Sequence, residues 1–215
     1  MEIYDTEEEQ VAAIKAWWKE NGTAAIIGIG IGLAAIFGWD YWQDYRKAQA
    51  QQASALYDEL VKATKANNTD SATKIAERMS SEFSGTDYVS YSSLMLAKTK
   101  AMHNDIPGAK AVLEQLIKNG DKELANLARI RLVRLMLANK EYEQGLKLIN
   151  EVDPATTESF AGQYDELTGD LYVALNRPDQ ARTSYQSAQR NGNQSSVLQM
   201  KMDDLTIPEK QEATK

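Results

Sequence analysis

The chain has 215 residues, no cysteine and a formal net charge of −7. The absence of cysteine excludes a disulfide framework, a thiolate metal site, a cysteine nucleophile and a cysteine-linked lipid anchor. The acidic balance argues against nucleic acid as a partner, because binding a phosphate backbone requires clustered Lys and Arg. The length suits one or two domains.

The N-terminal segment is acidic and amphipathic. Thr6, followed three residues later by a glutamate, forms a capping box that predicts a helix start. Three apolar residues then fall on one helical face: Val11, Ile14 and Trp18. Asn21-Gly22 predicts the end of this helix, followed by a bend into the next segment. We therefore expect residues 1–22 to form a cytoplasmic segment with a short amphipathic helix on the membrane surface, the alternative being a disordered acidic tail.

The next segment, from Thr23 to Trp39, contains no charged residue. A helix of this length covers about 26 Å at ~1.5 Å per residue, which is near the lower limit for a hydrocarbon core of about 30 Å. All tryptophans of the chain lie around its two ends, as in the aromatic belts at membrane interfaces: Trp17, Trp18, Trp39 and Trp42. We therefore expect a transmembrane helix over residues 23–42. A buried core helix would not need tryptophans at both ends, and a cleaved signal peptide would begin with a basic region.

Small residues form a stripe along one face of this segment. They are Ala24, Gly28, Gly32 and Ala35. Such a stripe lets a second helix pack closely, although glycine is also common in membrane helices generally. The flanking charges leave the orientation open, because two bases precede the segment and two follow it. The preceding lysines lie closer, which slightly favours a cytoplasmic N terminus.

The remainder of the chain carries an internal repeat. Ala109, Gly145 and Ala181 are small residues spaced 36 positions apart within similar segments, and a fainter copy lies at 70–79. Each copy follows an apolar stretch with helical periodicity, over 48–66, 87–103, 122–139 and 160–176. A small residue in the second helix of a pair lets it cross close to the first helix. The pattern thus predicts stacked antiparallel helix pairs, each of which buries its surface against its neighbours.

The predicted fold class is all-α, with a single transmembrane helix followed by an α-solenoid of about four tetratricopeptide-like helix pairs. The repeat domain is expected over residues 43–206, ending in a capping helix within 193–206, and residues 207–215 are expected to be a disordered tail. No Pro or Gly occurs between Gly38 and Gly85. The membrane helix is therefore expected to continue into the first repeat helix.

The sequence offers no recognisable catalytic chemistry. The single histidine, His103, has no nucleophile at a suggestive spacing, and no phosphate-binding loop or cluster of metal ligands is present. The glycines between Gly28 and Gly32 lie inside the apolar segment rather than in a loop. We therefore predict no enzymatic activity, cofactor, metal or small-molecule substrate.

Four short segments resemble the YfgM family, the ancillary subunit of the bacterial SecYEG translocon. They are Met1–Tyr4, Glu20–Gly22, Gly38–Trp42 and Met200–Leu205. The resemblance covers the whole chain and implies a single-pass protein of the bacterial inner membrane, with a cytoplasmic N terminus and a periplasmic repeat domain. It also implies association with SecYEG and a PpiD-like periplasmic chaperone, and assistance to unfolded secretory proteins leaving the translocon.

Two functional hypotheses follow. In the first, the protein is a translocon subunit that binds its partners along the inner surface of the repeats, for which tetratricopeptide geometry gives six candidate residues: Tyr91, Lys98, Arg134, Gln163, Glu166 and Asp170. In the second, it is a membrane-anchored repeat scaffold regulating a stress-response signalling protein, a role also attributed to the family. The second hypothesis requires the repeats to lie in the cytoplasm.

Overall fold

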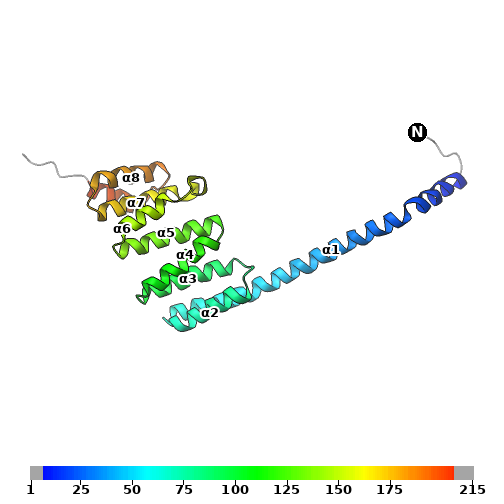
Figure 1. Cartoon of the computed structure of the whole chain (residues 1–215), viewed down its shortest axis with the longest axis horizontal. Coiled ribbons are helices and arrows are strands. Elements are labelled where there is room, and N and C mark those ends of the chain that lie inside the picture. Colours follow the sequence, from blue (N-terminus) through cyan, green and yellow to red (C-terminus); the bar gives the residue numbers. More distant parts are fainter. Residues whose placement is uncertain (1–6, 206–215) are drawn as a thin grey trace, which may run out of the picture. The chain divides into compact units, whose positions relative to one another are not determined.

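The described chain is built from α-helices joined by short turns (Figure 1). The computed structural model describes residues 7–205, so the predicted cap at Thr6 and the predicted tail at 207–215 lie outside the described residues. The contacts divide the chain into two units, Met1–Gln52 and Ala53–Lys215.

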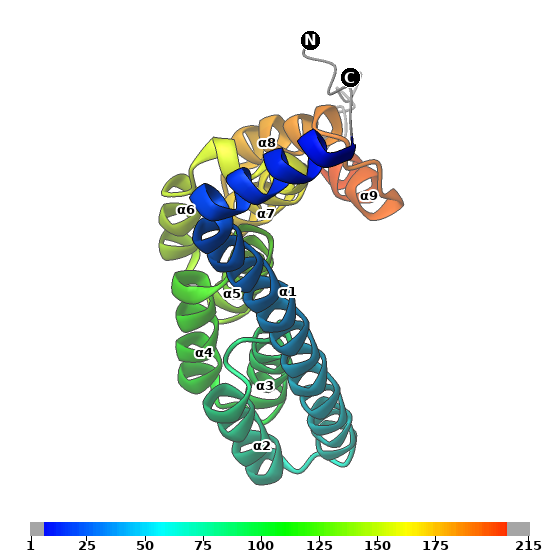
Figure 2. The same ribbon diagram turned by 90° about the vertical axis from the view of Figure 1, so that its right-hand side faces the viewer.

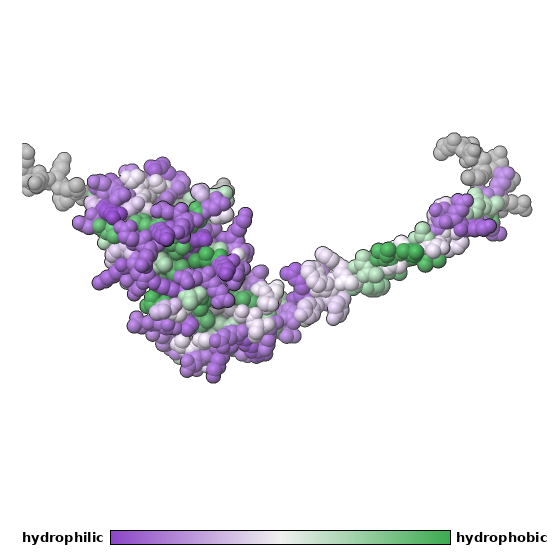
Figure 3. All heavy atoms as spheres, viewed as in Figure 1, coloured by the Kyte–Doolittle hydropathy of each residue, from purple (hydrophilic) through white to green (hydrophobic). Residues whose placement is uncertain are grey.

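Helix α1 spans Glu7–Lys65 and contains the whole apolar segment. It is the one helix in the described part of the chain that is long and apolar enough to cross a membrane, judged by length and composition. Figure 3 shows its apolar section as a continuous green band. The side chains of this band are exposed, with Ile31 at 66% and Phe37 at 67%. Such a surface is unfavourable in water, whereas lipid tails would solvate it.

The predicted helix end at Asn21-Gly22 is wrong, because α1 continues through both residues. The predicted bend is present, but within a continuous helix: its first turns, dark blue in Figure 2, run at an angle to the continuation. Asn21 Nδ2 donates to the Trp17 carbonyl over 3.2 Å, and a Cβ atom at Gly22 would lie 3.2 Å from Trp18 Cε2. A glycine under a bulky ring together with a side chain bonded to a carbonyl is a recognised setting for a bend.

The second unit is a stack of antiparallel helix pairs, which confirms the all-α solenoid (Figure 1). The first helices of the pairs are here called A helices and the second ones B helices. The A helices are the end of α1 from Ala53, α3 (Tyr88–Met102), α5 (Lys122–Ala138) and α7 (Ala161–Ala174). The B helices are α2 (Thr69–Glu82), α4 (Ile106–Asn119), α6 (Tyr142–Asn150) and α8 (Pro178–Arg190). The short 3₁₀ turns η1 (Pro154–Thr156) and η2 (Glu158–Phe160) precede α7, and α9 (Ser196–Asp204) follows α8.

The small residues of the repeat are buried inside the stack of helices. Ala109 and Ala181 are fully buried. Gly145 is buried too, and a Cβ atom there would lie 3.1 Å from Leu171 Cδ2 of the next A helix. One hydrophobic cluster joins α3, α4 and α5, and another joins α5, α6 and α7. Each layer thus shares its core with the next, as the predicted stack requires.

The turn inside each helix pair has the same backbone geometry. Its central residue has a positive φ, at Asn67 (55°), Asn104 (61°), Lys140 (64°) and Asn176 (58°). The N–H of the following residue donates to a carbonyl of the preceding helix, as in the 2.9 Å bond from Asp105 to Lys100 and the 2.8 Å bond from Arg177 to Tyr172. This is the Schellman arrangement, which satisfies the last carbonyls of an A helix.

Candidate partner-binding surface

A groove runs between the neighbouring A helices α3 and α5, with α4 beneath it. It has a volume of about 360 Å³. Its apolar wall consists of Ala97, Ala101, Leu113, Leu135 and Ala138. Three of these residues are alanines, which carry a single side-chain carbon and therefore leave the space between the two helices open.

A second hollow, of about 270 Å³, extends this groove toward α1. The two hollows share Lys98 and Arg131. Aromatic and apolar side chains complete the second one: Tyr57, Tyr91, Leu94, Met95 and Leu127. The ring of Tyr88, next to this hollow, lies 5.8 Å from that of Tyr57 and 6.3 Å from that of Tyr91. The two hollows are together called the A-helix groove below.

The rim of the A-helix groove is positively charged. Lys98, Arg131 and Arg134 line it, and no acidic residue does so in the described part of the chain. These three bases form no ion pair with any residue between 7 and 205. Arg131 Nη1 donates to the Leu94 carbonyl over 3.3 Å, which holds its side chain across the groove. A protein with a net charge of −7 thus exposes a cationic patch beside an apolar surface.

The last repeat carries acidic residues, and these bind α9. Lys201 Nζ lies 2.6 Å from Glu166 Oε1 and 2.8 Å from Asp170 Oδ2. Asn193 Nδ2 donates to Glu166 Oε2 over 2.7 Å, and the Tyr185 hydroxyl donates to Asp170 Oδ1 over 2.8 Å. Side chains from α8, α9 and the turn between them therefore meet on these two carboxylates of α7.

The charges of this cluster stabilise one another. Burial alone would raise the pKa of Glu166, but hydrogen bonds from Lys201 and Asn193 outweigh it and hold the pKa below its ordinary value. Burial alone would lower the pKa of Lys201, but its bonds to Asp170 and Glu166 raise it. Burial and the neighbouring carboxylates raise the pKa of Tyr185. All three groups therefore keep their ordinary charge states near neutral pH.

The structure separates the six predicted surface residues into two sets. Tyr91, Lys98 and Arg134 lie at the A-helix groove. The other three are on α7, where Glu166 and Asp170 are already engaged by α9 and Gln163 is partly exposed. Sequence reasoning missed Arg131, which precedes Arg134 by three residues and therefore shares its helical face.

The predicted membrane residues are exposed in the isolated chain. A Cβ atom at Gly28 or Gly32 would meet nothing within 4 Å, and Ala24 and Ala35 are exposed as well. No part of this chain that the structure describes therefore covers the small-residue stripe.

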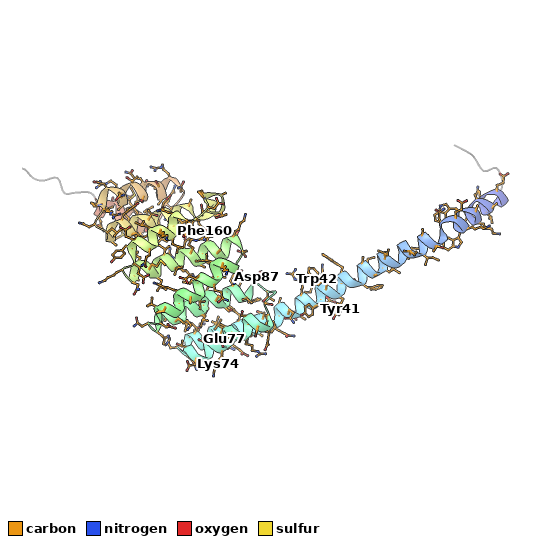
Figure 4. The ribbon with its side chains drawn as sticks, viewed as in Figure 1. Tyr41, Trp42, Lys74, Glu77, Asp87 and Phe160 are labelled. Atoms are coloured by element: carbon orange, nitrogen blue, oxygen red, sulfur yellow. The ribbon has the colours of Figure 1, made fainter. Side chains whose placement is uncertain are left out.

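The tryptophans form a pair at each end of the apolar segment. Ring centroids are 6.4 Å apart for Trp17 and Trp18, and 5.2 Å apart for Trp39 and Trp42. The Arg46 guanidinium lies 5.0 Å from the Trp42 ring. Figure 4 shows Tyr41 and Trp42 projecting outward from α1. An apolar ring beside a polar or charged group suits the headgroup region of a bilayer.

The single histidine lies away from the A-helix groove. His103 follows the last residue of α3, is exposed, and its Nδ1 lies 2.9 Å from the Thr99 carbonyl oxygen. Among the described residues, no group of three or more His, Asp or Glu side chains is arranged to hold a metal ion.

Comparison with known proteins gives the same architecture. A tetratricopeptide repeat-like domain family matches residues 15–207. A Haemophilus influenzae protein named ancillary SecYEG translocon subunit is 32% identical over 206 residues, 94% of this chain and 99% of the relative. The Escherichia coli protein of that name is 30% identical over 211 residues, 96% of this chain and all of the relative.

A more distant relative of the same name, from Neisseria gonorrhoeae, is 26% identical over 207 residues, covering 93% of this chain and 97% of its own. No solved structure gives a significant match. None of the relatives is named for a catalytic activity. With near-complete coverage of both chains and a matching repeat-domain family, the chain belongs to the YfgM family of ancillary SecYEG translocon subunits, built on a tetratricopeptide repeat-like domain.

Proposed function

We propose that this protein is an ancillary subunit of the Sec translocon that binds a partner chaperone and emerging secretory proteins through its repeats. The observation that carries the proposal is the A-helix groove, an apolar surface with three unpaired bases that no described part of the chain covers. Exposed apolar surface next to polar groups is typical of an interaction site. The full-length relationship to ancillary translocon subunits supplies the kind of assembly.

The apolar section of α1 anchors this protein in the bacterial inner membrane as a single span. Its two tryptophan pairs lie at the two interfaces, and the bend in α1 lets the preceding amphipathic turns follow the bilayer surface. The N terminus faces the cytoplasm and the repeats face the periplasm, where secretory proteins emerge.

Because the chain contains no cysteine, single cysteines test this orientation directly. Gln186 is exposed on α8 and Gln10 is exposed before the span. In cells with a permeabilised outer membrane, Gln186→Cys is expected to react with a membrane-impermeant thiol reagent, and Gln10→Cys only after the inner membrane is broken. The opposite pattern would overturn the proposal and favour the second function, a cytoplasmic scaffold for a stress-response signalling protein.

The small-residue stripe on α1 is the proposed contact with a membrane helix of the translocon or of a PpiD-like chaperone. Leucine at both Gly28 and Gly32 would fill the surface that a second helix needs for close approach. We expect this double variant to lose co-purification with SecYEG or with the chaperone in mild detergent. Leucine at Gly30, which lies on another face of the helix, is the control. Equal recovery from this variant and the double variant would mean that the stripe is incidental to assembly.

A further inference from the structure

We infer that the A-helix groove selects acidic amphipathic segments. Such a segment would place an apolar side chain against the apolar wall of the groove and a carboxylate beside Lys98 and Arg134. The inference rests on the proposed function, in which the groove faces partner chains, and adds the chemistry by which those chains are chosen. Two independent observations carry it: the charge of the rim, and the way in which α9 is bound one repeat further on.

The rim selects by the sign of charge. Lys98 and Arg134 occupy the same position in consecutive A helices, one repeat of 36 residues apart. Both are exposed and neither forms a direct ion pair with a described residue, although Arg134 lies near enough to Glu166 to help lower the pKa of that carboxyl. Two such bases on the edge of an apolar groove attract a carboxylate and repel an ammonium group, and this discrimination requires no fixed peptide sequence.

The apolar wall of the groove provides the hydrophobic contact surface of the site. Ala97 and Leu113 are almost completely buried, whereas Ala138 is exposed at the open side of the groove. The two hollows together are large enough for apolar side chains, and they continue into the aromatic wall formed by Tyr57 and Tyr91. Burial of an apolar side chain there would provide binding energy, and the rim would determine which flanking charge is tolerated.

Helix α9 shows the same kind of binding with the opposite charge. Leu198 of α9 is buried at 2% exposure, and Lys201, one turn later, reaches Glu166 and Asp170 of α7. Asp170 holds in α7 the position that Lys98 and Arg134 hold in α3 and α5. At that position the last repeat uses a carboxylate to bind the lysine of the amphipathic helix α9. A segment with a carboxylate in place of the lysine therefore complements the two preceding repeats.

The test uses the full-length protein in detergent micelles and three short fluorescein-labelled peptides. One combines Leu with Asp, the second replaces each Asp by Lys, and the third keeps Asp but replaces each Leu by Ser. Fluorescence anisotropy is expected to show the Leu–Asp peptide binding at least about tenfold more tightly than either of the others. Its affinity should fall as salt is raised from ~0.1 to ~0.5 M, since rim charges are screened.

Charge reversal makes the result decisive. Lys98→Glu combined with Arg134→Glu is expected to abolish the preference for Asp and to favour the Lys peptide, which also demonstrates that the variant remains folded. Lys74→Glu is the matched control, because Lys74 is exposed on the B helix α2 and forms no ion pair with a described residue (Figure 4).

Equal binding of the Asp and Lys peptides, absence of binding by the Leu–Asp peptide, or an unchanged preference after charge reversal would overturn the inference. None of these results would alter co-purification with SecYEG, which tests the proposed function. The two ideas can therefore fail separately.

Discussion

The hydroxyl group of Tyr164 in α7 donates a hydrogen bond to Asn126 Oδ1 in α5 over 2.8 Å, inside the repeat domain. Asn126 is 1% exposed, and its Nδ2 donates to the carbonyls of Lys122 and Thr156, each over 2.8 Å. One buried amide thus connects two consecutive A helices and the η1 turn that precedes α7. A polar network of this kind fixes how neighbouring layers of a solenoid are aligned.

Removing the amide is expected to destabilise the repeats. Asn126→Ala removes the shorter of the two bonds made by the Tyr164 hydroxyl, leaving only the 3.4 Å bond to the backbone carbonyl of residue 126, and it leaves the Thr156 carbonyl without its side-chain donor. It should lower the free energy of unfolding by about 1–3 kcal/mol. Tyr164→Phe should cost about 1 kcal/mol, because it removes one donor. Urea unfolding followed by circular dichroism measures both. Tyr172→Phe is the control, since the Tyr172 hydroxyl makes no hydrogen bond with a described residue, and an equal effect there would contradict this role for Asn126.

The cluster around Lys201 is expected to make α9 sensitive to acid. In the folded protein the pKa of Glu166 lies below the ordinary 4.5, so the stabilisation is complete above about pH 4.5 and is lost as pH falls through the lowered pKa. Lys201→Met should therefore lower the melting temperature at pH 7 and have less effect at about pH 3.

Lys147→Met is the matched control for this pH dependence. Lys147 lies 3.9 Å from Glu151, and both side chains are largely exposed, so their interaction should contribute little. Thermal unfolding of both variants at the two pH values is the measurement. If Lys201→Met lowered the melting temperature as much in acid as at neutral pH, packing rather than charge would hold α9 in place.

The close approach of α7 and α8 depends on Gly169. A Cβ atom there would overlap the ring of Tyr185, which is 2% exposed and cannot move away easily. Gly169→Ala should therefore destabilise the fold by about 1–3 kcal/mol, despite the better helix propensity of alanine. Gly85→Ala, where a Cβ atom would meet nothing within 4 Å, should change stability by less than about 0.5 kcal/mol. Similar midpoints of urea unfolding for the two variants would contradict the overlap.

Among the four turn residues with a positive φ, Lys140 is the one whose residue type is least suited to that backbone conformation. It adopts a φ of 64°, a left-handed conformation that asparagine tolerates better than lysine. Lys140→Asn should raise the free energy of unfolding by roughly 0.5–1 kcal/mol, and Asn104→Lys should lower it by a similar amount. Both effects can be read from the same urea titration. A change of the same sign in both variants would contradict a backbone origin.

Much of the fold could be predicted from the sequence, because the same helix-pair pattern occurs in several copies along the chain. Ala109, Gly145 and Ala181 are all buried, as the small-residue pattern predicts, and Gly145 lies at a close approach between α6 and α7. The continuous α1 was also predictable, because no Pro or Gly interrupts the chain between Gly38 and Gly85. The asparagines of the turns carry a further repeat signal, at the 36- or 37-residue spacing from Asn67 to Asn104 and on through position 140 to Asn176.

The details of the candidate surface could not be predicted, because they depend on contacts between residues that are far apart in the sequence. Glu166 and Asp170 look like free inner-surface carboxylates until Lys201, 31 or more residues away, is seen between them. Before the apolar segment the sequence predicts a bend and also a helix end, because Asn-Gly is a common stop signal, and only the bend is present. There the helix continues through Asn21 and Gly22, and the Asn21 side chain bonds to the Trp17 carbonyl at the bend.

Photo-crosslinking in cells tests most directly whether the A-helix groove receives partner chains. A photoreactive residue at Lys98, in the groove on α3, is compared with one at Lys74, on the B helix α2. We predict that the probe at position 98 captures secretory chains arrested in the translocon or a PpiD-like chaperone, and that the probe at position 74 captures neither. Capture from position 74 alone, or equally from both positions, would contradict binding in the A-helix groove.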